Sequence, residues 1–413
     1  MRKERGFTVV EMVVSLLVTV VLILGILALF DFANRLSRVQ TNVSDMQQSL
    51  RVSLQSAVRM VRMAGRGGLP LGTVPSGLGL AVQNNVPAGT RIGGALTPPV
   101  LEGTDVITVR GVFSNPIWQI NSANPASFTL VNGVGGPVSG TVRIGGATPT
   151  GINQDREVLR QAVINGVPEA LVLVSPRDAA IYAVVELDPA SSVVGGTGDW
   201  TIGFRMVGGS HTPSYLPLSS GGGWPVALTS TAFVGLLEEY RFYVRDEREG
   251  SEMAPRFSRA RVFPGTQAPH RNDNDPLLEP EKHESWSQDI ADNILDLQVA
   301  LGFDTAQGGG AMTDDEGDSG DDDRIFESAD GRDDDWLYND SQAFNPAPWN
   351  GRQLYFVRMS VLARTDRRDP QYQSPQVARI EDHNLAASVV NQRTERMYRR
   401  RLLQTVIDMR NLG

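Results

Sequence analysis

A single carboxylate stands at the start of a long apolar stretch near the N-terminus. Glu11 precedes residues 12–30, which are 19 residues without a charge. At about 1.5 Å per residue, a helix of this length nearly crosses the ~30 Å hydrocarbon core of a bilayer. A carboxylate in or beside hydrocarbon is costly and usually serves a function. Glu11 is therefore the first candidate functional residue, and a plain membrane anchor does not account for it.

A second concentration of carboxylates lies late in the chain. Residues 314–340 hold 13 acidic residues against Arg324 and Arg332. Carboxylates spaced one to three residues apart, with glycines between them, can wrap oxygen ligands around Ca²⁺. The spacing departs from the EF-hand pattern, so a solvated, self-repelling loop is the simpler interpretation. The alternative is a calcium site whose candidate ligands are Asp314, Asp318, Asp321 and Asp323.

Composition excludes several other chemistries. The chain has no Cys, which rules out disulfides, thiolate metal sites and a Cys nucleophile. Its four His are widely spaced, and His383, beside Glu381 and Asp382, is expected in an exposed loop. The usual nucleotide-binding, serine-hydrolase and zinc-protease motifs are missing. Residues 1–70 have a net charge of +5, so the overall −9 leaves −14 on the rest, and no nucleic-acid partner is expected.

The N-terminal stretch predicts one long helix over residues 7–64. Basic residues in the opening MRKERG favour a cytoplasmic N-terminus. A secretory signal peptide is the alternative, but its apolar core is usually shorter and no small-residue cleavage site precedes Asp31. Residues 7–30 are expected to be transmembrane and 31–64 amphipathic, ending at glycines 65, 67 and 68. The amphipathic part has apolar residues every three or four positions: Leu36, Val39, Val43, Met46, Leu50, Leu54 and Val61.

The remainder, residues 65–413, predicts a β-rich head with an acidic insert at 304–350. Apolar or alternating runs typical of strands occupy residues 106–109, 171–174, 181–187, 239–245, 294–301 and 353–362. The runs 171–174 and 181–187 flank a Pro-containing turn and predict a hairpin. Glycine-rich residues 133–151 and 207–223 predict surface loops, while residues 402–409 fit a strand or a helix equally. These elements predict an α+β protein with one long helix.

The N-terminal residues carry a family resemblance. Gly6-Phe7-Thr8-Val9-Val10-Glu11, between a basic leader and an apolar run, resembles the prepilin motif of type IV pilins and type II secretion pseudopilins. The resemblance implies that a prepilin peptidase removes residues 1–6, cutting between Gly6 and Phe7, and methylates the amine of Phe7. It also implies that Glu11 pairs with the N-terminal amine of a neighbouring subunit, because a buried cation needs a partner.

The order of the later elements resembles the PilW-type minor pilins. The similarity lies in LVLVSPRDAAIYAVVEL, EYRFYVRDE, ILDLQVALGFD and the closing RMYRRRLLQTVIDMRNLG. It implies a pilin-like fold, with the long helix packed on an antiparallel sheet, and a role in pilus initiation or the tip complex rather than catalysis. The implied partners are the prepilin peptidase, other minor and major pilins, the inner-membrane assembly platform and a tip adhesin. The implied location is the inner membrane, with a periplasmic head, and later the pilus.

The sequence leaves two alternatives to a minor pilin. A J-type pseudopilin of a type II secretion system shares the motif, although such pseudopilins are usually smaller than this chain. A membrane-anchored periplasmic enzyme belongs to another class and requires a convergent polar cleft, for which the sequence gives no motif.

Overall fold

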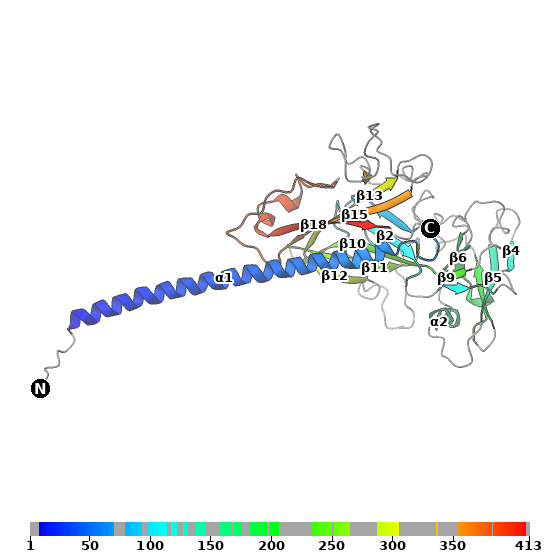
Figure 1. The fold of residues 1–413 in the computed structure, drawn as a ribbon, viewed down its shortest axis with the longest axis horizontal. Helices are drawn as coiled ribbons and strands as arrows, with labels where there is room; N and C mark the ends of the chain where they lie inside the picture. The colour runs from blue at the N-terminus through cyan, green and yellow to red at the C-terminus, as the bar shows by residue number, and fades with distance from the viewer. Residues whose placement is uncertain are drawn as a thin grey trace, which may run out of the picture.

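A computed structural model describes residues 8–69, 79–92, 97–113, 117–121, 127–130, 138–145, 157–166, 169–175, 182–195, 199–205, 233–249, 252–264, 287–304, 336–337, 353–381 and 383–409. Helix α1, Val9–Arg62, runs for 54 residues and leaves the head as one continuous, gently curved rod (Figure 1). No proline interrupts it, and Gly25 in its apolar half does not break it. The long helix predicted from the apolar stripe is present.

The sheets nearest α1 are two antiparallel sheets joined by one chain segment. The first has the order β1-β2-β10-β11-β12, and the second has the order β14-β13-β15-β18. Asn293 is the single residue between β12 and β13, and its φ of 62° turns the chain from one sheet into the other. The strands are β1 Leu80–Gln83, β2 Val106–Gly111, β10 Glu238–Glu249, β11 Glu252–Val262, β12 Ser287–Asp292, β13 Ile294–Asp304, β14 Trp336–Leu337, β15 Gln353–Arg364 and β18 Arg400–Asp408.

One hydrophobic core joins the second half of α1 to both sheets. The buried residues of α1 begin at Met46 and recur at helical spacing to Val61. They pack with Phe242 and Phe257 of the first sheet and with Val299 of the second, among others. The head therefore packs on the apolar stripe predicted for residues 31–64, but the stripe is buried only from Met46 onward. We call α1 from Met46 onward, with these two sheets, the proximal unit.

A second sheet system is inserted between β2 and β10. Its seven antiparallel strands have the order β3-β9-β6-β7-β8-β5-β4, and together with helix α2, Glu157–Asn165, they form what we call the inserted lobe. It lies at the end of the molecule opposite the N-terminus (Figure 1). The strands are β3 Trp118–Gln119, β4 Ser127–Leu130, β5 Val138–Ile144, β6 Ala170–Val174, β7 Tyr182–Leu187, β8 Trp200–Arg205 and β9 Phe233–Leu236.

Both faces of the lobe's central strands are buried. Leu171 and Leu173 of β6 pack with Leu159 of α2 in one core. Val172 and Val174 point to the other face, where a second core includes residues of the proximal unit such as Val112 and Phe263. Burial on both sides explains why the run 171–174 is continuously apolar instead of alternating.

The predicted α+β class is confirmed, and the described residues of the predicted strands fall within β2, β6, β7, β10, β13 and β15. The hairpin is present, with Leu171 opposite Val185 in the β6–β7 ladder. Residues 402–408 of the ambiguous run 402–409 belong to strand β18, which pairs with β15. The loop predicted for 133–151 was wrong in part, because residues 138–144 form β5 between β4 and β8.

Short elements complete the described fold. Strands β16 Arg379–Ile380 and β17 His383–Asn384 and the 3₁₀ turns Val389–Asn391 and Glu395–Met397 precede β18. Another 3₁₀ turn, Pro189–Ser191, lies in the inserted lobe.

Candidate functional site

Glu11 lies in the first turn of α1 and is bound by the residue that begins the helix. Thr8 is the N-cap, and its hydroxyl accepts a hydrogen bond from the Glu11 amide at 3.3 Å. In return, the Thr8 amide and hydroxyl donate to Glu11 Oε2 at 2.9 and 3.0 Å. This is a reciprocal capping box, which satisfies two otherwise free groups at the start of the helix. The Glu11 carboxylate thus has a defined orientation in the isolated chain.

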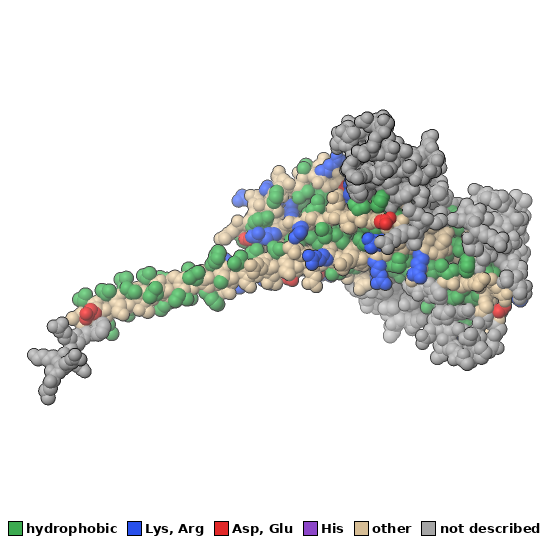
Figure 2. All heavy atoms as spheres, in the orientation of Figure 1, with side chains coloured by type: hydrophobic (Ala, Val, Ile, Leu, Met, Phe, Trp, Pro, Cys, Tyr) green, Lys and Arg blue, Asp and Glu red, His purple; other side chains and the backbone are tan. Residues whose placement is uncertain are grey.

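The apolar half of α1 is not covered by any part of the chain that the structure describes. Its most apolar 18-residue window has a mean hydropathy of 3.1, and none of that window is buried. The side chains exposed there include Val9, Leu16, Leu24 and Phe30. Figure 2 shows apolar side chains along this outer part of the helix. Within the described ranges, α1 is the one helix long and apolar enough to cross a membrane. Such a surface requires lipid or other apolar helices around it.

Two of the three predicted N-terminal site residues, Gly6 and Phe7, lie outside the described residues. The calcium candidates Asp314, Asp318, Asp321 and Asp323 also lie outside them, as does most of the predicted insert 304–350. In the part of the chain that the structure describes, no group of three or more His, Asp or Glu side chains is arranged to hold a metal ion. The structure therefore orients Glu11 and leaves the cleavage and calcium predictions untested.

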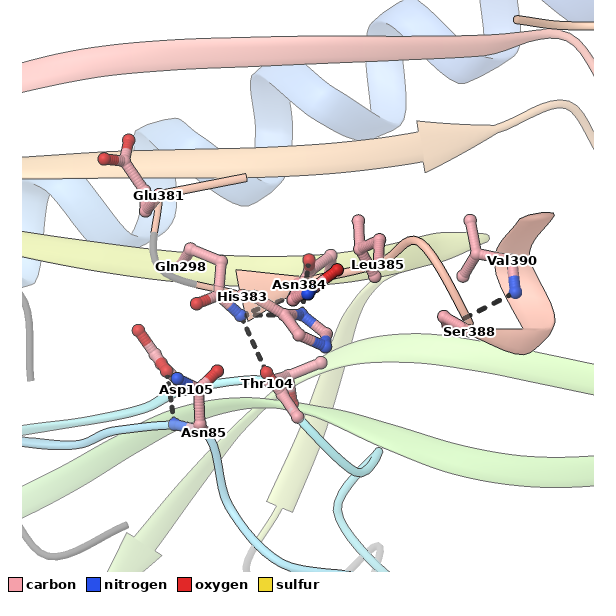
Figure 3. Close-up of polar contacts among 12 residues, drawn as sticks. Asn85, Thr104, Asp105, Gln298, Glu381, His383, Asn384, Leu385, Ser388 and Val390 are labelled. Atoms are coloured by element: carbon pink, nitrogen blue, oxygen red, sulfur yellow. Dashed lines mark hydrogen bonds and ion pairs between the residues drawn. The ribbon is translucent and has the colours of Figure 1, made fainter. Parts of the chain in front are cut away.

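Sequence reasoning missed a polar network inside the proximal unit (Figure 3). His383, expected in an exposed loop, is instead largely buried, and its Nδ1 lies 2.9 Å from Asp296 Oδ2. Gln298 Nε2 donates to Asp296 Oδ1 and to the Gly103 carbonyl, each at 2.8 Å. The buried alternation of Asp296 and Gln298 within an apolar strand was the sequence signal that something polar covers this side of β13.

A related buried carboxylate joins the two proximal sheets. Asp105 is fully buried, and its two oxygens accept from the Asn85 amide and the Val299 amide, both at 2.8 Å. Its own amide donates to the Leu297 carbonyl at 2.9 Å. Asp105 precedes β2, Asn85 follows β1 and Val299 lies in β13, so one side chain links the first sheet to the second. These contacts connect the two sheets that share a hydrophobic core with α1.

Two family comparisons match this architecture. Residues 1–27 match the Prokaryotic N-terminal methylation motif, which contains Glu11 and most of the exposed apolar helix. Residues 241–411 match Type IV Pilus-assembly protein W, PilW. The chain carries both signatures of a PilW-type pilin. Neither the curated proteins nor the solved structures gave a match. The PilW match and the methylation motif support a type IV pilus-related pilin, a class whose family domains are structural.

The PilW match maps onto a definite part of the fold. It begins at Arg241 within β10 and continues past β18, so it covers the second proximal sheet and most of the first. The inserted lobe lies before the matched range. The matched residues thus supply most of the strands that share a core with α1, and the lobe lies at the far end of the molecule, outside the match.

Proposed function

We propose that this chain is a minor pilin of a type IV pilus that takes part in filament initiation or in the tip complex. The supporting observation is the combination of a methylation motif with a capped Glu11, a bare apolar helix and a PilW-type head on one chain. Its work is recognition and assembly and not catalysis. The proposal divides the chain into a leader of residues 1–6, a long helix of residues 7–64 and a head of residues 65–413.

The route begins in the inner membrane. The apolar half of α1 anchors the precursor, with the N-terminus in the cytoplasm and the head in the periplasm. A prepilin peptidase cuts between Gly6 and Phe7 and methylates the new amine. The assembly platform then moves the helix from lipid into the filament, where other minor and major pilins cover the same apolar side chains and the head meets a tip adhesin.

Glu11 supplies the register in this proposal. The amine of Phe7 becomes a cation among apolar helices, where an unpaired charge is very unfavourable. Glu11 of a neighbouring copy or another pilin balances that charge. Thr8 already holds the Glu11 carboxylate at the surface of the first turn, with Oε2 as the acceptor. The carboxylate is thereby available at a fixed height on the helix, which a subunit joining the filament needs.

The test separates insertion from assembly. Glu11→Ala should leave the chain in the membrane fraction and reduce its recovery in sheared pili at least tenfold. Asp31→Ala is the matched control, because it removes an exposed acidic residue of the same helix that pairs with the exposed Arg35. Normal recovery of the Glu11 variant in pili would refute the register role. Gly6→Ala should block processing, seen as a band about six residues heavier, and normal processing of that variant would refute the cleavage site.

A further inference from the structure

A hollow of about 940 Å³ lies where the head comes closest to the apolar half of α1. One wall is the stretch of α1 between Phe32 and Asp45, and the other is the loop at residues 365–371 after β15. Figure 1 shows the segment between β15 and β18 as the part of the head that reaches furthest along α1 towards the N-terminus. Five arginines line the hollow: Arg35, Arg38, Arg367, Arg368 and Arg399.

The height of this hollow along α1 matches that of lipid headgroups. The uncharged run ends at Phe30, so Arg35 lies about 7.5 Å and Arg38 about 12 Å further along the helix axis. The headgroup layer of one leaflet is about 5–8 Å thick, and an arginine side chain can extend several ångströms back towards it. Phe32, which is highly exposed, stands at the boundary as an interfacial aromatic residue. The loop beside these residues is therefore at the membrane surface whenever the apolar half spans the bilayer.

The arginines differ in how strongly the protein itself engages them. Arg399 is paired with Asp369 at 3.0 Å, and Arg368 lies over the ring of Tyr398. Arg367 has an exposed side chain 3.9 Å from the equally exposed Asp366, which is a weak surface pair. Arg38 is exposed and makes no ion pair with any residue that the structure describes.

The lining as a whole is basic. Its acidic residues are Asp45, Asp366 and Asp369, so five arginines leave a net charge of +2. Guanidinium groups are well suited to phosphate because they offer several N–H donors in one plane. We propose that this surface binds the phosphates of anionic phospholipids, mainly through Arg38 and Arg367. The proposal rests on the membrane anchoring of α1 proposed above, and adds that the head itself recognises the bilayer surface before the subunit leaves it.

The experiment uses the full chain in lipid nanodiscs. The absence of Cys allows a single fluorophore at Gln371→Cys, an exposed position of the loop. Discs of phosphatidylcholine alone, or with about one third phosphatidylglycerol, carry a trace lipid with a nitroxide quencher on its headgroup. Each arginine near an anionic surface changes binding about fivefold. We expect phosphatidylglycerol to raise quenching at least threefold, and about 0.5 M salt to abolish most of that gain.

Arg38→Gln combined with Arg367→Gln should return quenching to the level of phosphatidylcholine alone. Arg51→Gln combined with Arg59→Gln removes the same charge from exposed positions of α1 more than about 30 Å beyond Phe30, and should change nothing. Equal quenching in both lipid mixtures would overturn the proposal, as would equal losses in both double variants. Flotation of the discs with the protein reports anchoring separately. Protein that floats without a lipid-dependent signal contradicts this inference alone, whereas protein that does not float contradicts the anchoring as well.

Discussion

Removing the Asp105 carboxylate should loosen the proximal unit by detaching its two sheets from each other. Asp105 is fully buried, and its oxygens are the acceptors for the Asn85 and Val299 amides at 2.8 Å. Asp105→Ala leaves both N–H groups inside the protein without these acceptors. Each such loss costs about 1–3 kcal/mol, and bonds to a charged acceptor lie towards the upper end. For the two amides together, the expected decrease in unfolding free energy is therefore about 2–6 kcal/mol.

This free energy converts into a measurable shift of the unfolding midpoint. With a urea dependence of about 3 kcal/mol per molar, typical of a large domain, the midpoint should fall by about 0.7–2 M. Pulse proteolysis of the full chain in detergent reports that midpoint. Hydrogen exchange followed by mass spectrometry should show faster exchange in peptides containing Asn85 and Val299, while peptides of the inserted lobe keep their protection.

Asp408→Ala serves as the control because Asp408 is an exposed carboxylate on β18. It should change the unfolding free energy by less than about 0.5 kcal/mol. Asp105→Asn keeps one acceptor oxygen and places an NH₂ group against the other amide, so it should be destabilised, with one of the two amides still protected. If Asp105→Ala unfolds within 0.2 M (on the order of the measurement error) of the wild type, or if the two amides keep their protection, the carboxylate does not join the sheets.

Two further predictions concern the head. Burial raises the pKa of Tyr243 to about 12. The unfolded chain therefore loses the Tyr243 proton near pH 10, while the folded chain keeps it. The contribution of this group to stability is complete below about pH 10 and is lost as the pH rises from about 10 to 12. Tyr243→Phe should flatten this alkaline decline, measured as unfolding midpoints at about pH 9 and pH 11.5, and an unchanged slope would contradict it. Replacing residues 114–235 by a short Gly-Ser loop should leave hydrogen-exchange protection of β11 and β15 intact, and loss of that protection would show that the proximal unit depends on the lobe.

The sequence was most informative where local pattern and burial coincide. The apolar stripe from Leu36 to Val61 predicted α1, and from Met46 onward that stripe is the face that packs into one large core. Strands β6, β7 and β13 were predictable because they lie in the core and are therefore apolar over most of their length. Glu11 stood out for the opposite reason, as a charge where the pattern demands apolar residues. In each case the signal lies within a few neighbouring residues.

Features that depend on distant partners were not predictable in the same way. The apolar pattern of residues 402–409 fits both the strand period and the helix period. Pairing with β15, about 45 residues earlier in sequence, makes residues 402–408 a strand. Asp105 and His383 look like ordinary loop residues until β13 supplies Val299 and Asp296 as their partners. Strand β5 was missed because its glycine resembles a loop signal, although neighbouring strands β4 and β8 hold it on both sides.

The inserted lobe is joined to the proximal unit by a short and rigid root. Gly111 of β2 and Glu238 of β10 are directly opposite each other in the ladder, so the chain leaves and returns at the same point. Buried ion pairs hold this point: Glu239 accepts from Arg110 at 2.7 Å and from Arg241 at 2.6 Å. Glu238 Oε2 also accepts from the Phe113 amide at 2.9 Å.

The end of α1 adds a second fixed contact to this root. Gly67 has a φ of 104°, and a Cβ there would meet Val112 at 2.7 Å, while a Cβ at Gly68 would meet Val174 of the lobe at 3.1 Å. The turn after α1 therefore packs against both units without room for a side chain. A lobe fixed at two such points cannot swing freely relative to α1. Its position at the end opposite the apolar half of α1 is thus set by the fold, and any partner bound there would be held at a constant distance from that helix.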